Sequence, residues 1–325
     1  MLMSVLLFAV GLVLLIKGGD WFVDGATGIA KRFNLPDIVV GATVVSIGTT
    51  LPEVMVSTTG ALAGSGAMAY GNAIGSIICN TSLIAAISIV CNPGPVNTKS
   101  MKTPAIFFFV SAGLYCLASY ILGTFPRWMG FVMLAIFVVY MVTTVRNGMK
   151  NPDAAHEEEE EENGKPRTLV QELLLLVVGA AVIAVGADLL VEHGQIIAIG
   201  LGVPETVVAL LFVALGTSLP ELVTTITSLR SGHASLGVGN VIGANVFNLV
   251  LVSGVAVSLA PFDVPCENFL LNTGLNMSLV FEIPVMLGVM SLMIFPTLAS
   301  KKLARWQGIL LLCIYAAFCV CQFVL

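Results

Sequence analysis

The sequence predicts an all-α, polytopic membrane protein whose ten transmembrane helices form two inverted-topology repeats of five helices. Its composition is the first reason: 57% of the 325 residues are apolar, 10% are charged, and the mean hydropathy is +1.00. A soluble domain has about 25% charged residues, so this chain has too few to cover a water-exposed surface. The other reasons are a series of apolar runs of helical length and an internal repeat.

Apolar runs separated by Gly, Pro and charged residues set the expected helices. Each transmembrane helix needs about 20 predominantly apolar residues. We expect helices at 2–30, 36–63, 69–91, 104–122, 128–147, 168–198, 204–230, 236–260, 276–297 and 303–324. They divide the chain into a first half at 1–147 and a second half at 168–325.

The polar stretch at 148–167 joins the two halves and contains six consecutive acids, Glu157–Glu162. Such a run is typical of a disordered, solvated linker, and Ca²⁺ sensing is a second interpretation. Cytoplasmic loops are enriched in Lys and Arg. Twelve of the 14 Lys and Arg residues lie in loops that follow odd-numbered helices, and the exceptions are Lys17 and Arg127. We therefore expect a protein of the cell membrane with both termini outside and a cytoplasmic linker.

The internal repeat relates residues near 10–93 to residues near 178–261 at a constant offset of 168, without a gap. Between 36–80 and 204–248, 16 of 45 positions are identical. Each half has five helices, an odd number, so the two copies enter the membrane from opposite sides. Inverted repeats are typical of secondary transporters, whose substrate site lies near the midplane between the copies.

One conserved block of the repeat carries an acid next to a helix-breaking residue. It reads Gly48-Thr-Thr-Leu-Pro-Glu53 in the first copy and Gly216-Thr-Ser-Leu-Pro-Glu221 in the second. Proline removes one backbone donor and displaces a carbonyl, so we expect helix breaks at Pro52 and Pro220. An intramembrane acid is by default a functional site. Carbonyls, hydroxyls and two carboxylates would form an all-oxygen cage, which suits hard cations such as Ca²⁺ or a pair of Na⁺.

The other block places polar residues at one-turn spacing on a single helix face. In the first copy these are Asn72, Ser76 and Asn80, and in the second they are Asn240, Ala244 and Asn248. Asn80 and Asn248 should lie at the depth of the two acids. Asn72 and Asn240 are nearer the helix ends, where we expect buried amides that join helices together.

Both blocks resemble the two α-repeats of the calcium/cation antiporter superfamily, in its sodium/calcium exchanger branch. The similarity to the compact prokaryotic members extends almost end to end and includes Gly19-Asp-Trp-Phe-Val23 and Arg305-Trp-Gln-Gly308. The resemblance implies a ten-helix fold in which the first and sixth helices slide as a gate. It also implies a ligand set: the carboxylates of Glu53 and Glu221, carbonyls of Thr49 and Thr217, hydroxyls of Thr50 and Ser218, main-chain oxygens of Ser46 and Ala214, and the side chains of Ser76 and Asn80.

Some positions depart from the family pattern. Many members have a serine where this chain has Ala244, and an aspartate, especially in potassium-dependent members, where it has Asn248. The second departure argues against K⁺ co-transport and leaves the stoichiometry open. The calcium/proton branch has a glutamate where this chain has Gly75 and Gly243, which argues against proton coupling.

Other functional classes fit the sequence less well. It has no basic patch for nucleic acid, and neither a nucleophile–base pair nor the His-Glu-x-x-His motif of an intramembrane hydrolase. A channel could use the same oxygens, but inverted repeats with broken helices favour alternating access. We expect a Na⁺/Ca²⁺ antiporter, not an enzyme, that acts as a monomer in lipid without a cofactor. A proton-coupled exchanger of Ca²⁺ or another divalent cation is the alternative.

Overall fold

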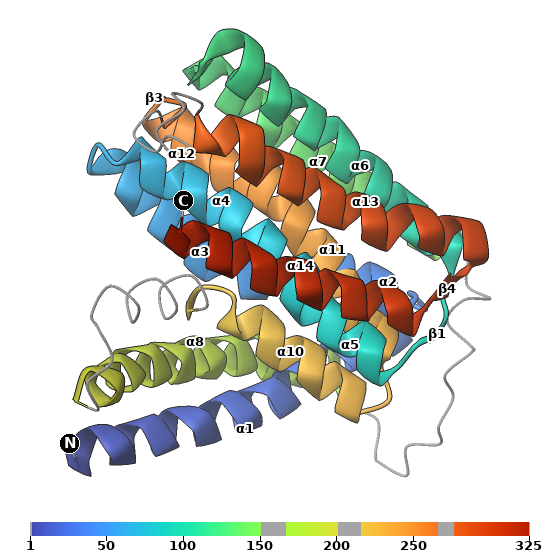
Figure 1. Ribbon diagram of the computed structural model, residues 1–325. Coiled ribbons are helices and arrows are strands. Elements are labelled where there is room, and N and C mark those ends of the chain that lie inside the picture. Colours follow the sequence, from blue (N-terminus) through green and yellow to red (C-terminus); the bar gives the residue numbers. More distant parts are fainter. Residues whose placement is uncertain (1, 151–166, 201–215, 266–275, 325) are drawn as a thin grey trace.

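Helices make up nearly all of the computed structural model, which describes residues 2–150, 167–200, 216–265 and 276–324 (Figure 1). The predicted all-α fold class is therefore confirmed. Among the described residues, nine helices are long and apolar enough to cross a membrane. The predicted helix at 204–230 is described only in its last part, so its length is outside what the structure describes.

Within residues 2–150, several of the transmembrane helices pass through a short π-helical segment, labelled η. In chain order the helices are α1 (Leu2–Arg32); α2 (Asp37–Val40), η1 (Gly41–Val45) and α3 (Ser46–Leu62); α4 (Gly66–Cys79), η2 (Asn80–Ala85) and α5 (Ala86–Cys91); α6 (Thr98–Cys116) and η3 (Leu117–Leu122); and α7 (Arg127–Met149).

The second half repeats this pattern after the predicted linker, whose residues 151–166, with the Glu157–Glu162 run, lie outside the described residues. Its helices are α8 (Leu169–Gly200); α10 (Leu219–Arg230); α11 (Ala234–Phe247), η5 (Asn248–Val252) and α12 (Ser253–Leu259); η7 (Ser278–Glu282) and α13 (Ile283–Ser300); and α14 (Arg305–Val324).

Most predicted helix ends agree with the structure to within three residues, and the start of α6 is the clearest miss. The expected start at Pro104 is wrong, because the helix begins at Thr98. Asn97 caps it: the Asn97 Oδ1 accepts hydrogen bonds from the backbone N–H groups of Lys99 at 3.0 Å and Ser100 at 3.3 Å. This capping satisfies donors that a helix start leaves free, and the apolar run alone did not indicate it.

The core of the bundle is formed by the helices that carry the repeated blocks. In the span Ala234–Leu259, 83% of an 18-residue apolar stretch is buried inside the protein. The corresponding share in the span Arg305–Gln322 is 17%. Figure 1 shows α1 and α8 side by side at one edge of the bundle. Their outward apolar side chains are exposed, as expected for surfaces that face lipid.

Two short strand pairs show the inverted symmetry directly. β1 (Gly94–Pro95) pairs antiparallel with β4 (Lys302–Leu303), and β2 (Thr124–Phe125) pairs antiparallel with β3 (Phe262–Asp263). Adding the repeat offset of 168 residues to the positions of β1 gives the positions of β3. The two strand pairs are therefore equivalent in the repeat. Figure 1 shows β3 and the β1–β4 pair at opposite ends of the bundle, as two oppositely inserted copies require.

Glycines allow α1 and α8 to pack with their backbones in close contact. A Cβ added to Gly11 would lie 2.9 Å from the carbonyl oxygen of Gly186, and a Cβ added to Gly186 would lie 2.9 Å from that of Gly11. Small residues are the usual means of close helix approach in membranes. Near one end of this pair, Arg32 forms a 2.8 Å ion pair with the buried Glu172.

Candidate cation-binding site

The first acidic block lies within a helix that continues through its proline. α3 runs from Ser46 to Leu62 with Pro52 inside it, and Glu53 follows in the next position. The helix break expected at Pro52 is therefore wrong for the described helix. The departure from α-helical hydrogen bonding lies earlier, in η1 at Gly41–Val45. π-helical segments of this kind are frequent at functional sites.

In the second block the acid lies near the start of its helix. Residues 201–215 are outside the described residues, so the helix break expected at Pro220 stays a prediction. Thr217 and Ser218 form a turn, Ser218 is the N-cap of α10, and Pro220 lies in the first turn of that helix. Proline is well tolerated there because the first N–H groups of a helix have no intrahelical partner. Glu221 follows directly, close to the positive end of the helix dipole. The two copies therefore place equivalent acids in different local backbone structures.

Glu53 and Glu221 are fully buried, each with 0% of its surface exposed. The two side chains lie within electrostatic range of each other, and Glu221 lies beside the side chains of Thr49 and Thr50. Among the described residues, none donates a hydrogen bond to any of the four carboxylate oxygens. Buried charged or polar groups without partners are costly.

Other polar atoms of the predicted site share this unpaired state. They are Oγ1 of Thr50, Oγ of Ser218, and both amide atoms of Asn80 and of Asn248, all buried and without hydrogen-bond partners in the described part of the chain. The elements that carry these side chains are neighbours, since α3 contacts η5 and α10, and α10 contacts η2. We call these four residues, with Glu53 and Glu221, the cage.

Asn80 and Asn248 occupy equivalent places in the backbone. Each is the first residue of a π-helical segment, η2 and η5 respectively, and they are 168 residues apart. A π-helical turn widens the helix by one residue and shifts the side chains that follow. Both asparagines are 0% exposed, and their place at the depth of the acids stays a prediction.

Two symmetry-related hydrogen bonds connect the repeats next to the cage. Thr49 Oγ1 donates to Asn240 Oδ1 at 3.1 Å, and Thr217 Oγ1 donates to Asn72 Oδ1 at 3.4 Å. Ser46 Oγ lies 3.0 Å from the main-chain oxygen of Asn240. Asn72 and Asn240 therefore do more than join helices, since each orients the threonine of the opposite repeat. In the sequence, the feature that pointed to a shared role is that Asn72 and Asn240 occupy equivalent positions in the two repeats.

The remaining predicted ligands are placed as follows. Ser76 is buried on α4, one turn before Asn80, and Ala244 is buried at the equivalent place on α11. Gly243 on α11 contacts Ser46 and Ala42 so closely that a side chain would collide with them. Ala214 lies outside the described residues.

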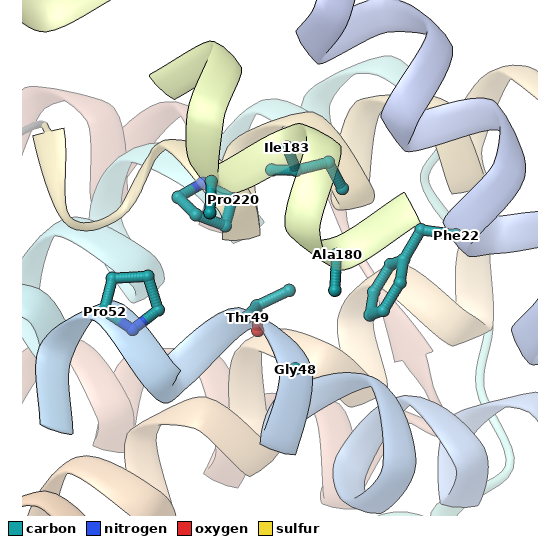
Figure 2. A pocket seen from close by; sticks show the side chains of 8 residues that line it. Phe22, Gly48, Thr49, Pro52, Ala180, Ile183 and Pro220 are labelled. Atoms are coloured by element: carbon teal, nitrogen blue, oxygen red, sulfur yellow. The ribbon is translucent and has the colours of Figure 1, made fainter. Parts of the chain in front are cut away.

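A small cavity lies where the α1–α8 pair meets the two acidic blocks (Figure 2). Its volume is about 10 Å³, room for a single water molecule. Figure 2 shows Pro52 and Pro220 on opposite walls, with Phe22 of α1 and Ala180 and Ile183 of α8 closing a side. The full lining is Phe22, Gly48, Thr49, Pro52, Ala180, Ile183, Ala184 and Pro220.

Comparisons with known proteins agree with this architecture. The model of the family described as "Sodium/calcium exchanger protein" matches residues 3–146 and 172–324. The chain is 31% identical to the sodium/calcium exchanger MaX1 of Methanosarcina acetivorans, over 98% of each chain. It is 33% identical to a membrane protein of Methanocaldococcus jannaschii, over 95% of this chain and 94% of the relative.

A solved structure of the sodium-calcium exchanger NCX_Mj, soaked with Na⁺ and Sr²⁺, is also similar. It superposes with a TM-score of 0.78 at 32% sequence identity and covers 97% of each chain. The match to the family model and the similarity of sequence and fold extend over nearly the whole chain. This protein is therefore a multi-pass membrane transporter that belongs to the sodium/calcium exchanger family.

Proposed function

We propose that this protein exchanges Na⁺ for Ca²⁺ across the cell membrane by alternating access to the cage around Glu53 and Glu221. The observation that carries the proposal is the burial of both carboxylates without a hydrogen-bond donor among the described residues. Two buried anions without partners cost several kcal/mol each. A bound cation removes that cost, so the geometry favours an occupied cage.

The ligand atoms favour a hard cation. Every unpaired group of the cage offers oxygen: carboxylates from Glu53 and Glu221, hydroxyls from Thr50 and Ser218, and amides from Asn80 and Asn248. Ca²⁺ takes 6–8 oxygen ligands in flexible geometry. In our proposal the further oxygens come from the carbonyls of Thr49 and Thr217, the main chain at Ser46 and Ala214, and Ser76.

Shared ligands account for exchange. The two carboxylates carry a charge of −2, which one Ca²⁺ or two Na⁺ neutralise, so the ions compete for the same oxygens. An empty cage leaves both charges buried and unpaired, which opposes the movement of the gate without an ion. The relatives support the choice of ions, because MaX1 is named a sodium/calcium exchanger and the NCX_Mj structure was soaked with Na⁺ and an alkaline-earth cation.

The test is transport by the full-length protein in liposomes. Vesicles loaded with Na⁺ should take up radiolabelled Ca²⁺ when diluted into Na⁺-free buffer, and a pH gradient without Na⁺ should produce no uptake. Uptake driven by the pH gradient alone would instead support the proton-coupled exchanger.

Variants of the two acids test the site. Glu53→Gln and Glu221→Gln keep the size of the side chain and remove its charge, so each should abolish exchange. Glu282→Gln is the matched control: Glu282 also lies in a transmembrane helix, but it accepts hydrogen bonds from Ser278 and Gln322 and lies outside the cage. Exchange that survives both cage variants would refute the site.

The proposed orientation has both termini outside and the linker at 148–167 in the cytoplasm. An epitope tag after Leu325 should be cleaved by protease added to intact cells, whereas one in the linker should be protected. The proposed monomer should have the mass of one chain when light scattering is measured on the purified protein.

A further inference from the structure

A buried hydrogen bond joins the segments that carry the two cage asparagines. Nδ2 of Asn245 on α11 donates to Oγ1 of Thr81 on η2 at 2.7 Å, and both residues are 0% exposed. Thr81 directly follows Asn80, and Asn245 precedes Asn248 by less than one helical turn. The bond therefore links the two repeats close to each cage asparagine.

A methionine of a third helix completes this contact. Sδ of Met290 on α13 accepts from Nδ2 of Asn245 and from Oγ1 of Thr81, in both cases at 3.1 Å. Helical threonines often donate to a carbonyl of their own helix, as Thr43 does to Val39. Thr81 instead directs its hydroxyl to α13, so its side chain holds η2 against two other helices. We call Asn245, Thr81 and Met290 the triad.

The equivalent place in the other repeat is apolar. The offset of 168 relates Asn245 to Ile77 and Thr81 to Leu249. Ile77 and Leu249 are fully buried members of the hydrophobic core, and the elements that carry them, α4 and η5, are in contact. Apolar side chains therefore fill this place in one repeat, and packing alone does not require a polar triad in the other.

The triad also contributes little to the stability of the fold. Sulfur is only a weak acceptor, and Oδ1 of Asn245 is buried without a hydrogen-bond partner among the described residues. An unpartnered buried polar atom is destabilising. Departures of this kind from apolar packing are expected at functional sites. The triad is therefore better explained by what it positions than by stability.

The groups within its reach are the amides of Asn80 and Asn248, whose atoms are buried and unpaired. A bond that fixes η2 on α11 limits how far these two amides can move apart. Selection among hard divalent cations depends on the size of the cavity and on the number and flexibility of its ligands. A cage held in this way excludes a larger ion, whereas a cage that can widen accepts it.

We infer that Asn245 is a positioning residue that, through Thr81, sets the size of the cage and thereby its preference for Ca²⁺ over larger divalent cations. The inference rests on the proposed function of the cage. Asn245 itself contacts no ion, and its effect reaches the ion through the segment that begins at Asn80. Ba²⁺ is the probe, because it has the charge of Ca²⁺ and a larger radius.

The test measures the apparent affinities for Ca²⁺ and Ba²⁺ by competition with radiolabelled Ca²⁺ on the purified full-length protein, and their ratio is the readout. A double variant combines Asn245→Leu with Thr81→Val. It gives the triad the apolar character of the other repeat and keeps the side chains near their original volume. The unmodified protein should prefer Ca²⁺, and the double variant should lower this preference about fivefold, the equivalent of one hydrogen bond.

Thr297→Val is the matched control. Oγ1 of Thr297 also accepts a hydrogen bond from a buried amide, that of Gln307 at 3.1 Å, and Thr297 is likewise fully buried. It lies on α13, as Met290 does, but belongs to neither the triad nor the cage. Its removal should lower the Tm slightly and leave the Ca²⁺/Ba²⁺ ratio unchanged, so the ratio separates positioning from a general loss of stability.

The single variants show whether the two residues act through their shared bond. Asn245→Leu and Thr81→Val each remove that bond, so each alone should change the ratio nearly as much as the double variant does. The inference is overturned by an unchanged ratio in these variants, by single effects that simply add, or by an unmodified protein that does not prefer Ca²⁺ to Ba²⁺.

These outcomes are separable from failure of the proposed function. If Glu53→Gln and Glu221→Gln abolish Ca²⁺ binding while the triad variants keep the ratio, the cage stands and this inference fails. If the protein binds Ca²⁺ without Na⁺-driven uptake, the exchange proposal fails while the ratio still tests Asn245. If the double variant does not fold, Thr81→Val alone, which exchanges a hydroxyl for a methyl group, is judged by the same ratio.

Discussion

Thr49 and Asn240 join the two repeats beside the cage, through a 3.1 Å hydrogen bond from Oγ1 of Thr49 to Oδ1 of Asn240. The inverted symmetry repeats this bond between Thr217 and Asn72. Each bond fixes the residue that starts the Thr-x-x-Pro-Glu segment of one copy to the polar helix of the other. The repeats therefore position each other's proposed ligands.

Replacing Thr49 with valine should weaken the cage. The change keeps the shape of the side chain but removes the donor to Asn240, at a cost of about 1 kcal/mol. If the loss falls on cation binding, the apparent affinity for Ca²⁺ should decrease about fivefold, as measured by concentration-dependent uptake. Thr43→Val is the control, because Thr43 donates only to the carbonyl of Val39 in its own helix. Equal effects of the two variants would contradict the proposed role.

Ca²⁺ should stabilise the folded protein, and the stabilisation should depend on Glu221. A ligand at 100 times its Kd adds about 2.7 kcal/mol to the free energy of unfolding, which raises the Tm in a thermal unfolding assay. Glu221→Gln should remove the shift produced by Ca²⁺ without removing the folding transition. A Tm of Glu221→Gln that still rises with Ca²⁺ would place the binding site elsewhere.

Ion pairs at one end of the α1–α8 pair should differ in their effect on stability. Arg32 pairs with Glu172, whose side chain is 7% exposed, whereas Arg167 pairs with Asp24 at 3.1 Å and both side chains are more than 40% exposed. Arg32→Ala leaves a buried acid without its partner, which is the costly way to break a pair. Exposed pairs contribute little. We expect a clearly lower Tm for Arg32→Ala and a small change for Arg167→Ala, and the reverse order would be inconsistent with the structure.

Alanine at Gly11 should separate α1 from α8. The new methyl group would lie 2.9 Å from the Gly186 carbonyl oxygen, so a backbone must move. Overpacking of this kind costs about 1–3 kcal/mol, and the Tm should decrease. Gly113→Ala is the matched control, since an added Cβ there has no atom of the described residues within 4 Å. In a helix interior, alanine is favoured over glycine by about 0.5–1 kcal/mol, so Gly113→Ala should not lower the Tm.

The sequence was sufficient to predict the helices and the pairing of the repeats. Apolar runs locate transmembrane helices because lipid solvates no backbone polar groups, and the offset of 168 identified Glu53 with Glu221 and Asn80 with Asn248. The start of α6 was wrong because it depends on capping by Asn97, which lies outside the apolar run. The fold class is confirmed, and the cation ligands stay a prediction.

Other features could not be read from the sequence for physical reasons. A π-helical segment adds one residue to a turn and leaves the composition unchanged, so η2 and η5 have no pattern that marks them. Continuation of α3 through Pro52 depends on how the neighbouring helices support the altered backbone. The bonds from Thr49 to Asn240 and from Thr217 to Asn72 depend on the relative register of helices from different repeats, which tertiary packing determines.

The strand pairs β1·β4 and β2·β3 have a mechanical consequence. Each one fastens a loop of the first half to a loop of the second half, and they do so at opposite ends of the bundle. Because these pairs join the two halves at both ends of the bundle, a movement that separates the halves must break one of them. In the proposed alternating access we therefore expect the joined halves to stay together. We expect α1 and α8, which lie side by side at one edge of the bundle, to be the elements that move.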